Sequence, residues 1–310
     1  MAKYITIDGG TTNTRISLAD NYEIVARKKY PVGARANMHD KTLLERTLRE
    51  GIKEILKETG AEKDEIECVL ASGMITSEFG TKELEHICTP AGKKQLHDSM
   101  VRDLNPNITD IPLYYIRGVK TEGGNPLDAD MMRGEESELF GLLGEERGEC
   151  VYVLAGTHSK VIWVEDGQIK RFDTMLTGEM LETLSENTIL SDAVKLENTQ
   201  TDWEYLWLGY VFCKNNGINT ALFKVRTLKN LLKKNDSQIY SFFMGAVLQG
   251  EIAQITAKTP GCVVIGGKKQ IKSAMAYILK KELKGSVTEI DDKAAESANS
   301  IGMIRIYECN

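Results

Sequence analysis

Apolar and polar positions alternate at the start of the chain, in the pattern of two short strands. Ile5 and Ile7 lie before the polar stretch DGGTTNTR, and Ile16 and Leu18 lie after it. Alternation over four to eight residues is typical of a half-buried strand, whereas apolar spacings of three and four predict a helix. Read in this way, the first half is typical of an α/β domain. Its predicted strands are 4–7, 15–19, 22–30, 66–72 and 111–116, and its predicted helices are 41–60 and 131–146.

The same order of elements starts again near residue 150. The segment CVYVLAGTHSKVIWVEDGQIKRF (150–172) again contains strand, Gly-Thr turn, strand, tight turn and strand. With a shift of 146 residues (156 − 10), four identities align with the first copy. They are Gly156 with Gly10, Thr157 with Thr11, Ile162 with Ile16 and Asp166 with Asp20. An internal repeat of this kind predicts two similar domains.

The two predicted domains span residues 1–146 and 147–310. The second contains additional helical material at about 178–258, ending in a predicted helix at 242–256. No low-complexity linker separates the halves, so we expect them to pack against a shared cleft. Beyond the additional material the predicted elements are strands at 262–267 and 286–290 and helices at 269–283 and 293–308.

Composition narrows the class of protein. At 310 residues, 42% hydrophobic and 27% charged, the chain suits a globular protein of two domains. A net charge of −6 argues against a general nucleic-acid binder, which needs clustered Lys and Arg. The first 20 residues lack the pattern of a signal peptide, and no run of 18 apolar residues predicts a membrane span. We therefore expect a cytoplasmic protein with neither nucleic acid nor membrane as partner. A homodimer is an open option for its oligomeric state.

The six cysteines are scattered through the chain without a C-x-x-C motif. This spacing predicts neither a zinc site nor a disulfide framework. Reduced thiols are expected, in keeping with a cytoplasmic location.

The polar turn between the first two strands combines one acid with glycines and side-chain donors. Glycine lets the backbone approach a ligand, and successive N–H groups in a turn form an anion site. Asp8 would repel a bare phosphate, but one or two carboxylates with water and phosphate oxygens suit Mg²⁺. The turn thus predicts a magnesium–nucleotide site, with Asp8 holding the metal through water; an ordinary Asp-Gly hairpin turn is the alternative. The candidate phosphate-binding residues are Gly9, Gly10, Thr11, Thr12 and Asn13.

Two later segments offer further phosphate-binding groups. The repeat places a second turn at Gly156, Thr157, His158, Ser159 and Lys160. The predicted strand CVVIGG then ends at Gly266 and Gly267 before a helix, whose N-terminal N–H groups could face a ligand. A Walker A loop is not present, because Cys262 stands at its first glycine and Lys269 follows its lysine. Close packing of the helix start is the alternative for the two glycines.

Charge is concentrated in DADMMRGEESEL (128–139), where a loop leads into a helix. Acidic residues near a helix N-terminus suit the helix dipole, which is a purely structural explanation. The functional alternative is that Arg133 clamps a carboxylate or phosphate while an acid accepts a proton from an attacking hydroxyl. The candidates are Asp130, Arg133, Glu135 and Glu136.

Several of these motifs together resemble a known family. The duplicated strand–turn pattern with DGGTTNTR resembles the superfamily of acetate and sugar kinases, Hsp70 and actin. MMRGEESELFG, GTHSKVIWV and FDTMLTGEML, together with SGMITSEFG and TPAG, are similar to the signatures of 2-dehydro-3-deoxygalactonokinases. These motifs run in family order from residue 5 to about 181. The resemblance implies an α/β fold of two duplicated ribonuclease H-like domains with an ATP cleft between them.

The resemblance also implies a reaction and roles for residues. It implies ATP- and Mg²⁺-dependent phosphorylation of the 6-hydroxyl of 2-dehydro-3-deoxy-D-galactonate, with Asp130 as base and Arg133 meeting the sugar-acid carboxylate. The implied substrate residues are Met74, Thr76, Ser77, Arg133, Glu135 and Glu136. Two alternatives stay open: a kinase for another small sugar acid or sugar, and a nucleotide-dependent binding or regulatory protein without catalysis, since fold alone does not fix function.

Overall fold

The computed structural model describes residues 2–38, 40, 42–121, 125–144, 148–196 and 200–309. It divides into two compact units. Unit 1 comprises residues 1–147, 165–171 and 293–310, and unit 2 comprises residues 148–164 and 172–292. The C-terminal segment therefore groups with the first half of the chain, whereas the sequence analysis assigned it to the second domain.

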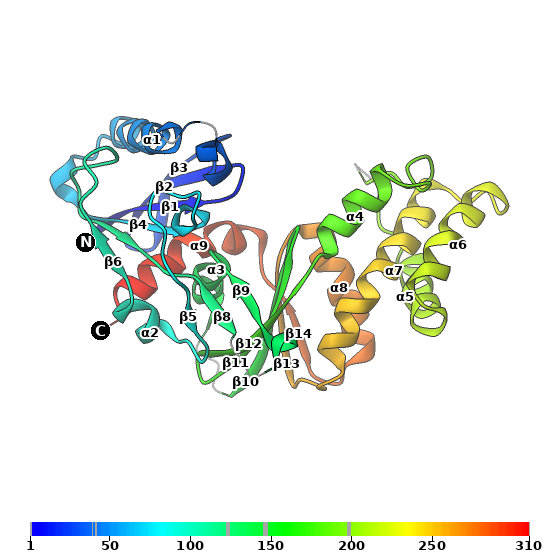
Figure 1. Ribbon diagram of the computed structural model, residues 1–310. Helices are drawn as coiled ribbons and strands as arrows, with labels where there is room; N and C mark the ends of the chain where they lie inside the picture. The colour runs from blue at the N-terminus through cyan, green and yellow to red at the C-terminus, as the bar shows by residue number, and fades with distance from the viewer. Residues whose placement is uncertain are drawn as a thin grey trace. The chain divides into compact units, whose positions relative to one another are not determined.

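Unit 1 is built on a six-stranded sheet in the order β3-β2-β1-β4-β7-β6, of which Figure 1 labels every strand but β7. The central strand β1 runs antiparallel to β2 and parallel to β4. Ile5 and Ile7 on β1 are fully buried, as are Ile16 and Val69 on its two neighbours. The strands are β1 (Lys3–Gly9), β2 (Thr14–Asp20), β3 (Glu23–Tyr30), β4 (Ile66–Gly73), β6 (Val101–Asp103) and β7 (Leu113–Tyr115).

A second, three-stranded sheet and a set of helices complete unit 1. The amphipathic helix α1 buries Leu44, Leu48, Ile52 and Ile55, and Gly60 ends it in a left-handed conformation with φ 68°. The small sheet has the order β5-β8-β9. These strands are β5 (Ile87–Cys88), β8 (Val119–Thr121) and β9 (Asp130–Met132); the α-helices are α1 (Leu43–Thr59), α2 (Lys93–Asp98), α3 (Glu135–Leu142) and α9 (Asp292–Tyr307); the 3₁₀ helices are η1 (Ala34–Met38), η2 (Lys63–Glu65), η3 (Met74–Thr76) and η4 (Pro126–Asp128).

A five-stranded sheet lies mainly in unit 2 and has the order β12-β11-β10-β13-β14. The order β12-β11-β10-β13 in this sheet corresponds to the order β3-β2-β1-β4 in the six-stranded sheet of unit 1. In addition, β10 runs parallel to β13 as β1 runs parallel to β4. The repeat predicted from the sequence is thus confirmed in the topology. The strands are β10 (Glu149–Ala155), β11 (Ser159–Glu165), β12 (Gln168–Met175), β13 (Cys262–Gly267) and β14 (Ser286–Glu289).

The additional material of unit 2 is helical, as predicted. Helices α5, α6 and α7 lie side by side (Figure 1) and share a core with the sheet, which includes Phe243, Leu248 and Ile252 of α7. The helices of this unit are α4 (Thr177–Glu186), α5 (Trp203–Asn216), α6 (Ile218–Asn230), α7 (Asp236–Thr256) and α8 (Lys269–Glu282).

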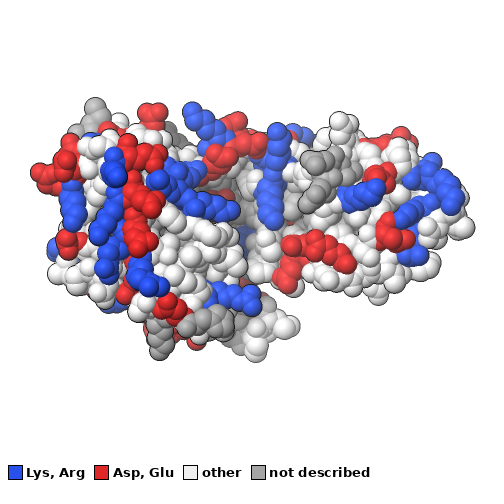
Figure 2. All heavy atoms as spheres, turned by 90° about the horizontal axis from the view of Figure 1, so that it is seen from above, with Lys and Arg blue, Asp and Glu red and all other residues white. Residues whose placement is uncertain are grey.

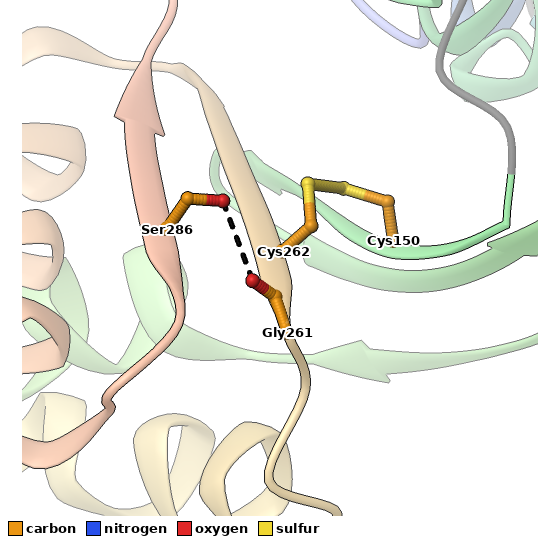
Figure 3. Close-up of a disulfide and its surroundings, with 4 residues drawn as sticks. All are labelled: Cys150, Gly261, Cys262 and Ser286. Atoms are coloured by element: carbon orange, nitrogen blue, oxygen red, sulfur yellow. Dashed lines mark hydrogen bonds between the residues drawn. A yellow bond between two sulfur atoms is a disulfide. The ribbon is translucent and has the colours of Figure 1, made fainter.

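A disulfide joins Cys150 to Cys262 across the neighbouring strands β10 and β13 (Figure 3). Beside it, Ser286 Oγ on β14 donates a hydrogen bond to the carbonyl of Gly261. The expectation that all six cysteines are reduced thiols is therefore wrong for this pair. Short spacings are the local signal of a disulfide framework, but these cysteines are 112 residues apart and meet because their strands are neighbours in the sheet.

Surface charge and hydropathy agree with the composition. Basic and acidic side chains are interspersed on the face drawn in Figure 2. Among the helices of the described residues, none is long and apolar enough to cross a membrane.

Candidate functional site

The first polar turn is held in shape by its own backbone and by η1. Gly10 N–H donates to the carbonyl of Asn13 at 2.8 Å. The carbonyls of Gly10 and Thr11 accept from the N–H groups of Ala34 and Arg35, at 3.0 Å each. With these carbonyls turned toward η1, the exposed Thr11 and Thr12 form the tip of the turn.

Asp8 lies one residue before the end of β1 and is paired across the hairpin. Arg15 Nη1 donates to Asp8 Oδ2 at 2.7 Å, because the two residues are register partners on β1 and β2. About a quarter of the Asp8 side chain is exposed (23%). The described residues hold no cluster of three or more His, Cys, Asp or Glu suited to a metal ion. Such a cluster is not required for Mg²⁺, which takes most of its ligands from water and phosphate.

Three glycines bring three segments of unit 1 together beside this turn. A Cβ on Gly73 would lie 2.5 Å from the carbonyl oxygen of Gly9, and a Cβ on Gly134 would lie 3.2 Å from Gly73 Cα. Both Gly73 (φ 89°) and Gly134 (φ 111°) have backbone angles that favour glycine. The ends of β1 and β4 and the start of α3 therefore meet backbone to backbone, in a cradle that side chains would fill.

Arg133 connects the charged segment to η3. Its Nη1 donates to both the carbonyl and the hydroxyl of Thr76, at 2.7 Å each. Its Nη2 donates to the carbonyl of Leu84 at 3.1 Å and lies 3.3 Å from His86 Nδ1. Burial lowers the pKa of Arg133. The structure thus brings the predicted residues Arg133 and Thr76 into contact. The guanidinium group of Arg133 forms its hydrogen bonds with protein groups of the segment from Thr76 to His86.

The remaining residues predicted on the sugar side lie in two places, around η3 and at the start of β9. Ser77 Oγ donates to the carbonyl of Met74 at 2.7 Å, and both residues belong to the turn around η3. Asp130 starts β9, where its Oδ1 accepts the N–H of Met131 at 2.7 Å and its own N–H donates to Thr121 Oγ1 at 2.8 Å. The roles of Asp130 as base and of Met74, Thr76 and Ser77 as substrate contacts stay predictions.

Glu135 and Glu136 begin α3 and bind backbone groups. Glu135 Oε2 accepts the N–H of Arg133 at 2.9 Å. The Glu136 carboxylate is fully buried and accepts the N–H of Gly134 with both oxygens, at 2.9 and 2.8 Å. Burial, reinforced by the neighbouring Glu135, raises the pKa of Glu136 to about 8. Glu136 therefore fixes the backbone at Gly134, one of the glycines of the cradle.

Glu138, which the sequence analysis did not select, lies one turn further along α3. Burial raises its pKa to about 7, and the charge of Asp8 adds to this effect. A second carboxylate close enough to Asp8 to feel its charge suits a site that receives a cation. The available sequence signal was its spacing of three residues from Glu135, which places both on one side of a helix.

In unit 2 the second turn follows β10 and is clamped by α4. Gly156 N–H donates to Ser159 Oγ at 3.3 Å. The carbonyl of Thr157 accepts the N–H of Glu179 at 3.0 Å, and His158 Nε2 lies 2.8 Å from Glu179 Oε2. Gly178 makes this approach possible, because a Cβ there would lie 2.3 Å from the carbonyl oxygen of Gly156.

Lys160, the last residue predicted in this turn, points into the protein. Only 4% of it is exposed, and its Nζ donates to Thr174 Oγ1 on β12 at 2.6 Å. Its ammonium group also lies over the ring of Phe172. Lys160 therefore joins β11 to β12, and a direct contact with phosphate stays a prediction.

The two glycines that end β13 lie beside the end of β10, from which the second turn starts. Gly266 and Gly267 are register partners of Leu154 and Ala155 on β10. Gly267 has φ 94°, and a Cβ there would lie 2.0 Å from the carbonyl oxygen of Ala155. Lys268, which was not selected from the sequence, reaches the turn with Nζ 3.4 Å from Thr157 Oγ1.

Two sheets with one strand order, each with a glycine turn after its first strand, define an α/β fold of the actin-like ATPase and sugar kinase class. Solved structures agree with this fold. The chain aligns over 98% of its length with a dehydratase component from Acidaminococcus fermentans (14% identity, 97% of that chain, TM-score 0.52). It also aligns over 99% of its length with the dehydratase activator of Clostridium difficile with bound ADPNP (12% identity, 95% of that chain, TM-score 0.50).

The 2-keto-3-deoxy-galactonokinase family model matches residues 8–306, so the chain belongs to this family of kinases. A putative 2-dehydro-3-deoxygalactonokinase from Sinorhizobium meliloti has the same fold, with TM-score 0.80 at 22% identity over 98% of this chain and 97% of that one.

Curated relatives in this family are distant. The 2-dehydro-3-deoxygalactonokinase of Escherichia coli is 24% identical over 260 residues, which are 82% of this chain and 80% of that protein. A probable 2-dehydro-3-deoxygalactonokinase of Rhizobium meliloti is 31% identical over 134 residues, and the alignment spans 42% of each chain.

Proposed function

We propose that this protein is an ATP-dependent kinase that phosphorylates the 6-hydroxyl of 2-dehydro-3-deoxy-D-galactonate. The observation that carries the proposal is the family match over residues 8–306, supported by glycine-lined turns at corresponding places in both units. Phosphoryl transfer depends mainly on positioning and charge stabilisation. Backbone turns with little side-chain bulk are suited to bind phosphates closely.

The proposal assigns both turns to the phosphates of ATP. In unit 1 these are residues 9–13, and in unit 2 they are residues 156–160, beside Gly266 and Gly267. Asp8 would hold Mg²⁺ through water, with Glu138 as a second carboxylate close to it. The metal would neutralise charge on the phosphates. The residues suit Mg²⁺ because Asp8 and Glu138 lie beside the glycine cradle, where no side chain fills the space.

Asp130 is proposed as the base and Arg133 as the group that meets the sugar-acid carboxylate. Removing a general base from a kinase of this type is expected to lower kcat by about 100-fold or more. The matched control is Asp128→Asn, since Asp128 is exposed and lies two residues away in η4. Asp130→Asn should abolish most turnover, whereas Asp128→Asn should retain it.

The decisive experiment measures ADP release from ATP with 2-dehydro-3-deoxygalactonate, beside its gluconate epimer and other small sugar acids. We expect turnover with the galactonate compound to exceed turnover with the epimer. Turnover only with another sugar or sugar acid would keep the kinase and change the substrate. Nucleotide binding without turnover on any acceptor would identify a non-catalytic nucleotide-binding protein instead.

A further inference from the structure

A carboxylate is buried in unit 2 behind the second turn. Glu251 lies on α7, and only 3% of its surface is exposed. Its Oε2 accepts a hydrogen bond from Thr177 Oγ1, whereas its Oε1 has no partner among the described residues. A buried charge is costly unless it is well hydrogen-bonded, so an apolar residue would fill this place at lower cost. The acid therefore calls for an explanation beyond packing.

The two hydroxyls at Glu251 belong to the turn and to the helix that clamps it. Ser159 lies close enough to the same carboxylate to lower its pKa, and the Oγ of Ser159 accepts the N–H of Gly156 at 3.3 Å. Thr177 is the first residue of α4, and Glu179 two residues later binds the carbonyl of Thr157. Glu251 is thus connected to the turn in two ways. One connection is Ser159, in the turn itself, and the other is Thr177, at the start of the helix that binds the turn.

The direction of these hydrogen bonds explains why an acid is suited to the position. An ionised carboxylate only accepts, so it draws the protons of both hydroxyls toward itself. The oxygen of Ser159 then keeps a lone pair for Gly156 N–H, which fixes the backbone at the start of the turn. Burial raises the pKa of Glu251 to about 7, and the hydrogen bonds from Thr177 and Ser159 oppose this rise.

We propose that Glu251 is a positioning residue for nucleotide binding, which holds the turn at 156–159 in its phosphate-binding shape through Ser159 and Thr177. This inference rests on the proposed function only in assigning that turn to a nucleotide. It does not depend on which sugar acid is phosphorylated.

The test measures the Kd of a non-hydrolysable ATP analogue with Mg²⁺ by calorimetry, without any sugar acid present. Glu251→Gln keeps the size of the side chain, but its amide donates to a hydroxyl and competes with Gly156 N–H for the Ser159 oxygen. We expect the Kd to rise about tenfold, the cost of roughly one such interaction. In the coupled assay the KM for ATP should rise while the KM for the sugar acid stays within twofold.

Thr177→Val provides a second route to the same result and remains informative if Glu251→Gln folds poorly. It removes the hydroxyl at similar size and should also weaken nucleotide binding. In the double variant the two effects should be less than additive, because both act through one network. Ser241→Ala is the control: Ser241 is a fully buried residue of the same helix whose oxygen binds Asp202 N–H at 2.8 Å, away from the turn.

The outcomes separate this inference from the proposed function. Unchanged nucleotide Kd in Glu251→Gln and Thr177→Val, with only a lower melting temperature, would show a structural role and overturn the inference. Wild-type protein that binds the analogue but phosphorylates no sugar acid would overturn the proposed function, while the comparison of Kd values would still decide the role of Glu251. Wild-type protein that binds no nucleotide would overturn both.

Discussion

At the scale of single residues, Glu136 makes stability depend on pH. Its pKa rises from an ordinary value of 4.5 to about 8 in the folded protein, so between these values the folded state binds a proton that the unfolded state has lost. Stability linked to this group is therefore highest at low pH and falls as pH rises toward 8. Glu136→Gln cannot ionise, and we expect its unfolding free energy to fall less steeply between pH 5 and 8.

Denaturant unfolding at a series of pH values measures this slope. A reduced slope is expected and not a zero slope, because Glu138 titrates in the same unit with a pKa raised to about 7. Glu78→Gln is the matched control, since Glu78 is exposed, and it should keep the wild-type slope. An unchanged slope in Glu136→Gln would mean that burial of this carboxyl does not perturb its ionisation.

The glycines of the candidate site can be selected from the sequence more easily than the residues that surround them in the structure. Gly9, Gly10 and Gly156 follow predicted strands, and a glycine at a strand end is a local signal. Lys268 and Glu251 reach the second turn from elements that are distant along the chain. Such contacts depend on which helix packs on which strand, and no local pattern encodes that. An acid within the apolar run of 242–256 was the only sequence signal for Glu251.

At the scale of elements, Gly178 sets how closely α4 approaches the second turn. In Gly178→Ala the new Cβ would lie 2.3 Å from the Gly156 carbonyl oxygen and 2.7 Å from Thr157 Cα, both backbone atoms that cannot rotate away. The turn must move, so we expect nucleotide Kd to rise by about tenfold or more. Gly250→Ala on α7 is the control, because nothing lies within 4 Å of its added Cβ. It should bind nucleotide normally and gain about 0.5–1 kcal/mol in stability.

Helix α9 is fixed to α3 by the same device. A Cβ on Gly302 would lie 1.7 Å from the Ser137 carbonyl oxygen, and a Cβ on Gly141 would lie 1.8 Å from the Ala298 carbonyl oxygen. Gly302→Ala should force the helices apart and cost about 1–3 kcal/mol in unfolding free energy, measured by denaturant unfolding. A loss no larger than about 0.5 kcal/mol would show that the helices can separate freely.

The bounds of α9 were predictable, whereas those of α3 were not. The predicted helix at 131–146 is helical as α3 only over Glu135–Leu142, and its start belongs to the strand β9 (Asp130–Met132). Apolar spacing predicted a final helix at 293–308, and the structure has α9 at Asp292–Tyr307. The same spacing cannot say that α9 groups with unit 1, where Asn299 Nδ2 donates to the Gly134 carbonyl at 3.1 Å. The predicted boundary at residues 146 and 147 therefore missed a segment that returns to the first unit at the end of the chain.

At the scale of the whole molecule, repetition was the strongest sequence signal. Only four identities aligned the copies, yet three of them fell at strand ends and turns, where backbone geometry restricts the residue type. The fourth, Ile16 with Ile162, is a buried position within a strand. Core positions vary more freely because many apolar residues fill similar space. This is why the order of strands in both sheets could be anticipated as a repeat, while the helices between β12 and β13 could be anticipated only as additional material.

The disulfide adds a constraint that local sequence patterns did not reveal. Cys150 and Cys262 close a segment of 112 residues that contains the second turn and helices α4 to α7. Closing so long a segment restricts the unfolded chain, and a native disulfide of this kind contributes about 2–4 kcal/mol. We expect reduction, or Cys150→Ser, to lower the unfolding free energy of unit 2 by that amount. Cys309→Ser, outside this segment, should leave it unchanged.

Thiol titration in denaturant provides an independent measure. Without reductant four of the six cysteines should react, and after reduction all six should react. Six reactive thiols before reduction would mean that the pair is not oxidised, and the loss of stability on adding reductant should then be absent as well. The disulfide lies at one end of β10 and β13, whereas the turn at 156–160 and the glycines at 266–267 lie at the other end. Reduction should therefore change the nucleotide affinity only under conditions in which it also unfolds the sheet.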